Sequence, residues 1–157
     1  MHIIQNNPYR ILGLLVGATA IQMNRHRTRL PNYINSETEI PLEFTEYSFE
    51  TLGKINRTEQ LISEAASKLN LDSDKMSSAL FWFYKGNPIT DEPAFDAIKE
   101  ADLDQVINIW TKLTSNGEVS QRNASAYSNL GTLYLSGILE GTNTNEAILE
   151  QGISLKL

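Results

Sequence analysis

The sequence predicts an all-α protein made of two groups of helices. Apolar residues recur at helical intervals along most of the chain, capping and stop signals separate the candidate helices, and strand signals are scarce. The 157 residues are enough for one domain or two small ones. We place the boundary after Asn70, which gives an N-terminal helical bundle at 1–70 and a C-terminal helical region at 71–157.

The N-terminal part contains three candidate helices. The first spans residues 8–14, with proline at an early helical position where its missing N–H costs nothing. The second begins at the capping residue Thr19 and is expected to end before Pro31, because proline disfavours the helical conformation of the preceding residue. Residues 32–46 are polar and contain a proline, which predicts a loop. The third helix is expected at 48–69, where apolar residues follow near-helical spacing.

The C-terminal part contains further candidate helices. The first is capped by Asp72 or Ser73 and ends at the Gly-Asn-Pro sequence of residues 86–88. The sequence Thr-Asp-Glu-Pro at 90–93 supplies a capping oxygen and acidic charges, so a short helix is expected at about 93–101. The remaining helices are expected at 102–114, 124–136 and 145–157, with an exposed loop at 137–143. Because the sequence ends within a helical pattern, region 71–157 is compatible with the front end of a longer repeat protein.

The composition is acidic, with a formal net charge of −6 and a pI of about 4.9. A diffuse acidic surface argues against a nucleic-acid-binding protein, because phosphate binding needs a concentrated cationic face. The first residues lack the long apolar core of a signal peptide, and the longest apolar-leaning run, 11–21, is too short to cross a membrane. We therefore expect a cytoplasmic protein with neither a nucleic-acid nor a membrane partner.

No catalytic residue, cofactor or metal site is expected. The chain has no cysteine, and its two histidines, His2 and His26, lack the spacing of metal ligands. Neither a Gly-rich phosphate-binding loop nor a Ser-centred nucleophile elbow is present. The acidic pair Asp91-Glu92 is interpreted as charges at the start of a helix rather than as paired catalytic carboxylates.

Two segments resemble a J domain, the co-chaperone module that stimulates heat-shock ATPases. The first is Asn7-Pro8-Tyr9-Arg10-Ile11-Leu12-Gly13-Leu14 followed by Ala18-Thr19, which is similar to the first J helix and the turn after it. The second comprises Leu52, Ile55-Asn56 and Leu61-Ile62-Ser63, similar to the third J helix. The resemblance covers about residues 7–69 and implies a J-like bundle. The chain lacks the His-Pro-Asp trigger of that family and has Leu30-Pro31-Asn32-Tyr33 instead, so ATPase stimulation is not expected.

The resemblance also implies a partner-binding helix. In J proteins a basic second helix meets an acidic groove of the ATPase, and Arg25, Arg27 and Arg29 keep that basic character here. A heat-shock chaperone is therefore one candidate partner. The other interpretation is that the three arginines are the solvated face of a helix.

The C-terminal part resembles tetratricopeptide repeats, in which pairs of helices stack. The first helix of such a repeat is similar to Tyr127-x2-Leu130-Gly131-x2-Tyr134, where the glycine lies at the closest approach of two helices. Val106-x3-Trp110 is similar to the second helix of the preceding unit, so Trp110 is expected to be buried. The residues expected to pack the repeats are Trp110, Tyr127, Leu130, Gly131 and Tyr134.

The leading functional hypothesis is a non-enzymatic adaptor, a J-like bundle joined to tetratricopeptide-like hairpins that binds a protein or peptide. A small-ligand-binding or enzymatic domain is the alternative, using the consecutive aromatic residues Phe81, Trp82, Phe83 and Tyr84. A less favoured third hypothesis is an active co-chaperone with a divergent trigger.

Overall fold

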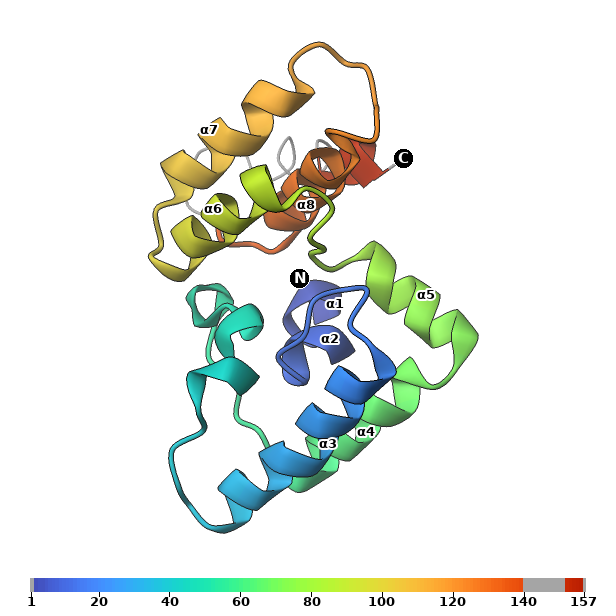
Figure 1. The fold of residues 1–157 in the computed structure, drawn as a ribbon, viewed down its shortest axis with the longest axis vertical. Helices are drawn as coiled ribbons and strands as arrows, with labels where there is room; N and C mark the ends of the chain where they lie inside the picture. The colour runs from blue at the N-terminus through green and yellow to red at the C-terminus, as the bar shows by residue number, and fades with distance from the viewer. Residues whose placement is uncertain (1, 140–151, 157) are drawn as a thin grey trace. The chain divides into compact units, whose positions relative to one another are not determined.

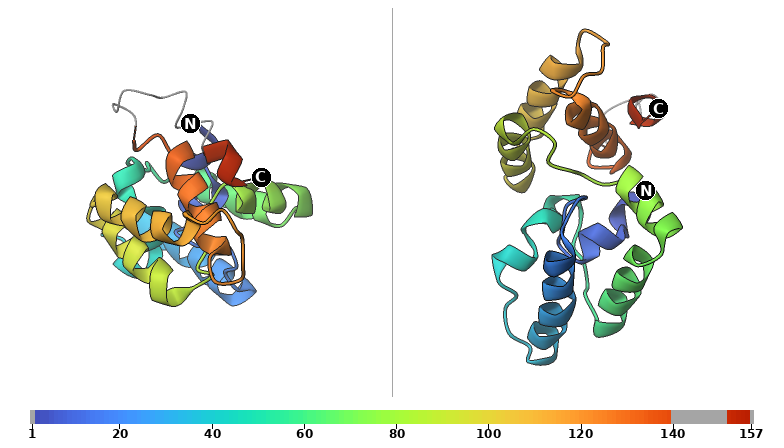
Figure 2. Two further views of the ribbon diagram at one scale, coloured as in Figure 1. Left: turned by 90° about the horizontal axis from the view of Figure 1, so that it is seen from above. Right: turned by 45° about the vertical axis from the view of Figure 1, so that its right-hand side comes forward.

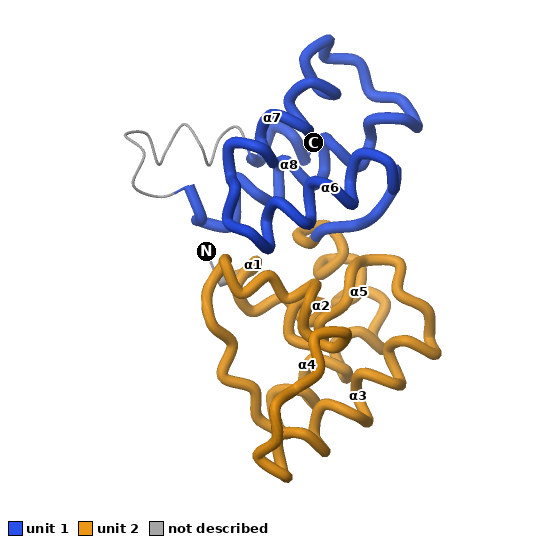
Figure 3. The backbone as a smooth tube through the Cα atoms, turned by 60° about the vertical axis from the view of Figure 1, so that its left-hand side comes forward, with its two compact units in different colours: residues 1, 83–157 blue, residues 2–82 orange. Residues whose placement is uncertain are grey.

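The computed structural model describes residues 2–139 and 152–156, and over these residues the all-α prediction is confirmed. The chain divides into two compact units, residues 2–82 and residues 83–157 (Figure 3). We call them the N-terminal and the C-terminal unit. The division falls after Trp82 rather than after Asn70, so the helix that follows Asn70 belongs to the N-terminal unit.

The N-terminal unit is built around one helix that contacts three others. Its α-helices are α1 (His2–Gln5), α2 (Pro8–Ile11), α3 (Ala20–Asn35), α4 (Glu59–Leu69) and α5 (Asp72–Leu80), with short 3-10 helices at Leu42–Phe44, Glu46–Ser48 and Glu50–Leu52. α4 packs against α2, α3 and α5. Helices α3 and α4 lie side by side (Figures 1 and 2).

Helix α3 continues through the proline that was expected to stop it. It is capped by Thr19 and Gln22 in a capping box, as the Thr19 prediction requires, but it ends at Asn35 with Pro31 inside. A proline inside a helix leaves the carbonyl four residues before it without its N–H partner. Residues on both sides of Pro31 hold the helix in place, because Leu30 is fully buried and the ring of Tyr33 packs 5.7 Å from that of Phe44.

The helix predicted at 48–69 is wrong over its first half, and α4 begins only at Glu59, after the capping residue Thr58. Two residues interrupt the expected helix. Phe49 has a left-handed backbone with φ of +49°, and Gly53 has φ of +125°, a conformation that side-chain-bearing residues rarely adopt. Phe49 and Leu52 are nevertheless buried, so the apolar spacing reflects packing of 3-10 turns rather than one continuous helix.

A buried arginine holds this irregular segment against the first helices. Arg10 is 2% exposed, and its guanidinium donates hydrogen bonds to the backbone carbonyls of Gln5, Ser48, Phe49 and Gly53. Ser48 returns a bond from its hydroxyl to the Arg10 carbonyl at 2.7 Å. The left-handed residue Phe49 is thus fixed through its own carbonyl, which offsets the cost of its backbone conformation.

The four consecutive aromatic residues do not lie on a helix, because α5 ends at Leu80 and Phe81 is its C-cap. Trp82 is fully buried in the N-terminal unit, where its indole N–H donates to the Leu14 carbonyl at 2.8 Å. Phe83 is fully buried in the C-terminal unit, with its ring 6.1 Å from that of Trp110. Neighbouring residues therefore belong to two different cores.

The C-terminal unit contains α6 (Pro88–Lys99), α7 (Leu103–Thr114) and α8 (Ala124–Leu135), and residues 152–156 are also helical. α7 packs against both α6 and α8. The predictions for α7 and α8 are confirmed to within a residue or two, and Asp102, the expected first residue of α7, is its N-cap. Most of the predicted helix 145–157, and residues 140–143 of the predicted loop 137–143, lie outside the described residues.

Helix α6 begins earlier than predicted. Asn87 caps it and Pro88 takes the first position, so the expected start at Pro93 is wrong and Pro93 lies inside the helix. Asp91 lies in the first turn of α6, in agreement with its interpretation as a charge at the start of a helix. It is fully buried and accepts hydrogen bonds from the backbone N–H groups of Gly86 and Asn87 and from the Trp110 indole at 3.0 Å.

The residues expected to pack the C-terminal helices are mostly interior. Trp110 is fully buried, as predicted, and Leu130 is 2% exposed. Tyr127 and Tyr134 are half-buried, and the Tyr127 hydroxyl donates to the Thr114 carbonyl. Gly131 is buried, and a Cβ placed on it would lie 3.0 Å from the Gly152 carbonyl oxygen and 3.2 Å from the Leu155 Cβ.

We predict that Gly131→Ala destabilises the chain and that Gly131→Leu does so more strongly. In an open helix, alanine would be better than glycine by about 1 kcal/mol. Here the new methyl meets a backbone oxygen that cannot rotate away, and overpacking of a close contact costs roughly 1–3 kcal/mol. Denaturant midpoints of the two variants measure the sign. A more stable alanine variant together with a neutral leucine variant would show that the contact is loose.

Candidate partner-binding surface

Helix α3 is a basic element in an acidic chain. Its sixteen residues include Arg25, Arg27 and Arg29 and no aspartate or glutamate, whereas the whole chain carries a net charge of −6. All three arginines are exposed. The helix is therefore a concentrated cationic feature, which the acidic composition of the chain conceals.

The structure does not bring the three arginines onto one face. The stripe of α3 that faces the core includes His26 and Leu30, both buried. Arg25 and Arg29 are one helical turn apart on one side of this stripe, and Arg27 lies on the other side. A partner that approaches from one side of α3 thus meets either the pair or Arg27.

Arg25 has partners within its own unit. Its guanidinium is 3.1 Å from the Glu43 carboxylate and lies 5.2 Å from the centre of the Phe44 ring. More than half of each charged side chain is exposed, so this ion pair contributes little to stability. It does neutralise part of the positive charge on this side of α3.

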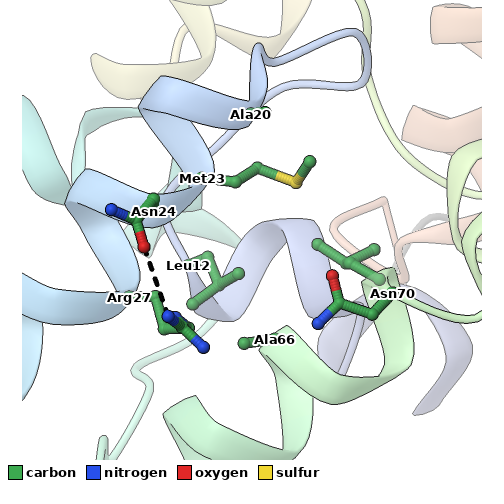
Figure 4. A pocket seen from close by; sticks show the side chains of 8 residues that line it. Leu12, Ala20, Met23, Asn24, Arg27, Ala66 and Asn70 are labelled. Carbon is green, nitrogen blue, oxygen red and sulfur yellow. Dashed lines mark hydrogen bonds between the residues drawn. The ribbon is translucent and has the colours of Figure 1, made fainter.

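Arg27 faces α4 and forms the lip of a cavity of about 220 Å³ (Figure 4). The floor is apolar, with Leu12, Ala66 and Leu69 almost fully buried and Met23 half-buried. The amide side chains of Asn24 and Asn70 stand at the rim, and Asn24 accepts a hydrogen bond from Arg27 at 3.2 Å.

The cavity continues along the two helices into a second hollow of about 280 Å³. Both hollows share Arg27, Ala66 and Asn70, and the second extends to Pro31 and Glu59. Small side chains keep the space open. They are Ala20 and Thr28 of α3 and Ser63, Ala66 and Ser67 of α4. We call the two hollows together the α3–α4 groove.

His26 is buried next to the groove and contacts Leu12, which lines the first hollow. It is 8% exposed, its Nδ1–H donates to the Leu12 carbonyl at 2.6 Å, and its ring packs edge-on against Phe44 at 4.9 Å. Burial lowers the pKa of His26 below its ordinary value of 6.5, with Arg25 and Arg57 acting in the same direction, while the Leu12 bond and Glu43 oppose the shift. The imidazole is therefore neutral in the folded protein at neutral pH.

Sequence reasoning identified the basic helix but missed the groove. Its walls come from two helices that are separated in the chain by residues 36–58, so no local pattern joins them. One signal was available, since Ser63, Ala66 and Ser67 put small residues on one stripe of α4. Small residues on a helix stripe indicate either close helix packing or an open trough, and only the structure separates the two.

Other candidate sites are less well supported. Trp82 and Phe83 are fully buried, so the aromatic run does not present a continuous exposed platform. Among residues 2–139 and 152–156, no group of three or more His, Asp or Glu side chains is placed to hold a metal ion. Within the same residues, no helix combines the length and apolarity needed to cross a membrane.

We predict that acidification destabilises the N-terminal unit through His26. The unfolded chain takes up a proton on this histidine near its ordinary pKa, whereas the folded state resists protonation to a lower pH. The unfolding free energy should therefore fall as the pH drops from about 7.5 to about 5.5, by at most about 1.4 kcal/mol per pH unit. Urea midpoints across this range measure the effect. His26→Gln should flatten the profile and His2→Ala should not; an unchanged profile in His26→Gln would contradict the assignment.

Comparison with models of protein families, with curated proteins and with solved structures finds no match to this chain.

Proposed function

We propose that this protein is a non-enzymatic adaptor that binds an acidic protein or peptide through α3. The observation that carries the proposal is the run of three exposed arginines on a helix without acidic residues, in a chain of net charge −6. A local cationic surface attracts an acidic partner and orients it during encounter. In this proposal the protein acts in the cytoplasm.

The resemblance to J domains supports the choice of surface and the absence of ATPase stimulation. A J-like bundle would present its basic second helix to an acidic groove of a heat-shock chaperone, and α3 corresponds to that helix. The segment Leu30-Pro31-Asn32-Tyr33, which stands where the trigger tripeptide is expected, lies within α3 and not in an exposed loop. We therefore propose docking without stimulation of ATP hydrolysis.

The C-terminal unit is proposed to be a second interaction platform of tetratricopeptide-like helices. Three features support this proposal: the hairpin of α6 and α7, the buried Trp110, and the close approach of residues 152–156 to Gly131. The alternative of a ligand site built on residues 81–84 has less support, because the two central aromatic rings are used in packing.

We predict that the purified chain does not accelerate ATP hydrolysis by the heat-shock chaperone of its host. The His-Pro-Asp trigger is missing from the sequence, and a docking helix alone does not reproduce its effect. Single-turnover hydrolysis with and without the chain measures this. A several-fold acceleration that is lost when Arg25, Arg27 and Arg29 are all changed to alanine would favour the active co-chaperone instead.

A charge-reversal experiment tests the adaptor proposal itself. The chain with Arg25, Arg27 and Arg29 all changed to glutamate should lose an acidic partner that the parent chain captures from host lysate, as quantified by mass spectrometry and repeated with the purified partner. The matched control reverses Lys75, Lys112 and Arg122, which are exposed and lie outside α3, and so makes the same change in net charge. Equal losses in both variants would show that only net charge matters and would remove the support for α3.

A further inference from the structure

We infer that the α3–α4 groove is an anchor site that takes one aliphatic side chain of an acidic partner segment, with a partner carboxylate against Arg27. This inference rests on the proposed function and deepens it, since it names which side of α3 the partner uses and what the partner must present. It concerns only the N-terminal unit.

The size and lining of the first hollow define the side chain. Its volume of about 220 Å³ is below the range of about 300–1,000 Å³ that is usual for small-molecule sites. An apolar cavity of about 150 Å³ is enough for a benzene-sized group, so one leucine, isoleucine or methionine side chain fits. The floor of Leu12, Ala66 and Leu69 offers such a side chain apolar contact.

Charge selects an acidic segment. Arg27 donates to the Asn24 amide oxygen, and within the described residues no carboxylate pairs with it. Its guanidinium has five N–H donors, so most of them are available to a carboxylate at the lip of the cavity. Arg25 differs from Arg27 in this respect, because its guanidinium already forms an ion pair with Glu43.

The two ends of the α3–α4 groove carry opposite charges, and this difference orients the partner. Glu59 lines the far end, in the second hollow, where it would repel acidic residues. Asn24 and Asn70 stand at the lips near Arg27 and can both donate and accept hydrogen bonds, as the backbone of a bound segment requires. Acidic residues of the partner are therefore placed at the Arg27 end.

The test uses methionine-methyl NMR on the full chain. The chain has three methionines, of which Met23 lines the cavity while Met76 is 74% exposed on α5 and serves as an internal control. The probe is a short synthetic peptide of glutamates with a single central leucine. Two control peptides carry alanine in place of the leucine, or lysines in place of the glutamates.

The expected result is a saturable shift of the Met23 methyl signal with the leucine peptide, while the Met76 signal stays in place. Replacement of the leucine by alanine should weaken binding about tenfold or more, because the buried methyl groups are lost. The lysine peptide should not shift Met23. An unmoved Met23 signal at the highest soluble peptide concentration overturns the inference.

Two pairs of variants locate the site. Arg27→Glu should abolish binding of the leucine peptide. Arg29→Glu makes the same charge change on the other side of α3 and should weaken binding by only about two- to threefold, because it removes long-range attraction alone. Ala20→Phe should fill the cavity from its exposed rim and block binding, and Ile21→Phe, at an 81% exposed position outside the cavity, should not.

The variants also separate failure of this inference from failure of the adaptor proposal. Equal effects of Arg27→Glu and Arg29→Glu, or equal binding of the leucine and alanine peptides, would leave α3 as a basic docking helix but remove the anchor site. Peptide binding that survives reversal of all three arginines would contradict both.

Discussion

The N-terminal unit depends on the hydrogen bonds that the guanidinium of Arg10 donates to backbone carbonyls. This guanidinium is buried, no carboxylate of the described residues forms an ion pair with it, and burial together with the nearby Arg57 lowers its pKa to about 10. At neutral pH it is still charged, so backbone carbonyl oxygens must replace its hydration. Those carbonyls belong to α1 and to the segment that links α3 to α4, and Arg10 itself is on α2. One side chain thus positions elements that share little regular secondary structure, and it holds α2 next to the cavity floor at Leu12.

Local sequence rules predicted the helices that have both a cap and an uninterrupted apolar face, and failed where packing overrides a local preference. Helix α7 is of the first kind, because the Asp102 side chain caps it. Helix α8 is also predicted correctly, although its N-cap residue Asn123 makes no side-chain capping bond. The sequence predicts helix boundaries at Pro31 and Pro93, but packing carries both helices through them. Leu30 is buried before Pro31 and the Tyr33 ring packs against Phe44 after it, and buried residues flank Pro93 on both sides. Its apolar spacing predicts that Phe49 lies in a helix. Instead, Phe49 has a left-handed backbone, and its carbonyl accepts a hydrogen bond from Arg10, which lies about forty residues earlier. No local pattern in the sequence reveals a contact of that range.

The sequence likewise predicts one part of the candidate site, and only the folded structure reveals the other. The sequence predicts that Arg25, Arg27 and Arg29 are exposed on one helix, because these charged residues do not belong to its apolar stripe. That Arg27 lines a cavity depends on α4, whose small residues face α3 only in the folded unit. Asp91 lies in the first turn of a helix, as the sequence predicts, but its burial and its hydrogen bonds from Trp110 and two backbone amides do not follow from the local sequence. Charged residues with buried backbone partners are therefore the features that sequence reasoning is least able to identify.

The placement of the two tryptophans gives each unit its own intrinsic fluorophore. Trp82 belongs to the N-terminal core, where its indole is bonded to a neutral carbonyl, and Trp110 belongs to the C-terminal core, where its indole is bonded to a carboxylate. Both are fully buried, and the chain contains two tryptophans in all. The emission of this protein is thus the sum of two signals from different electrostatic surroundings, each quenched or shifted when its own unit opens. A single cuvette experiment can in this way distinguish one cooperative transition from two.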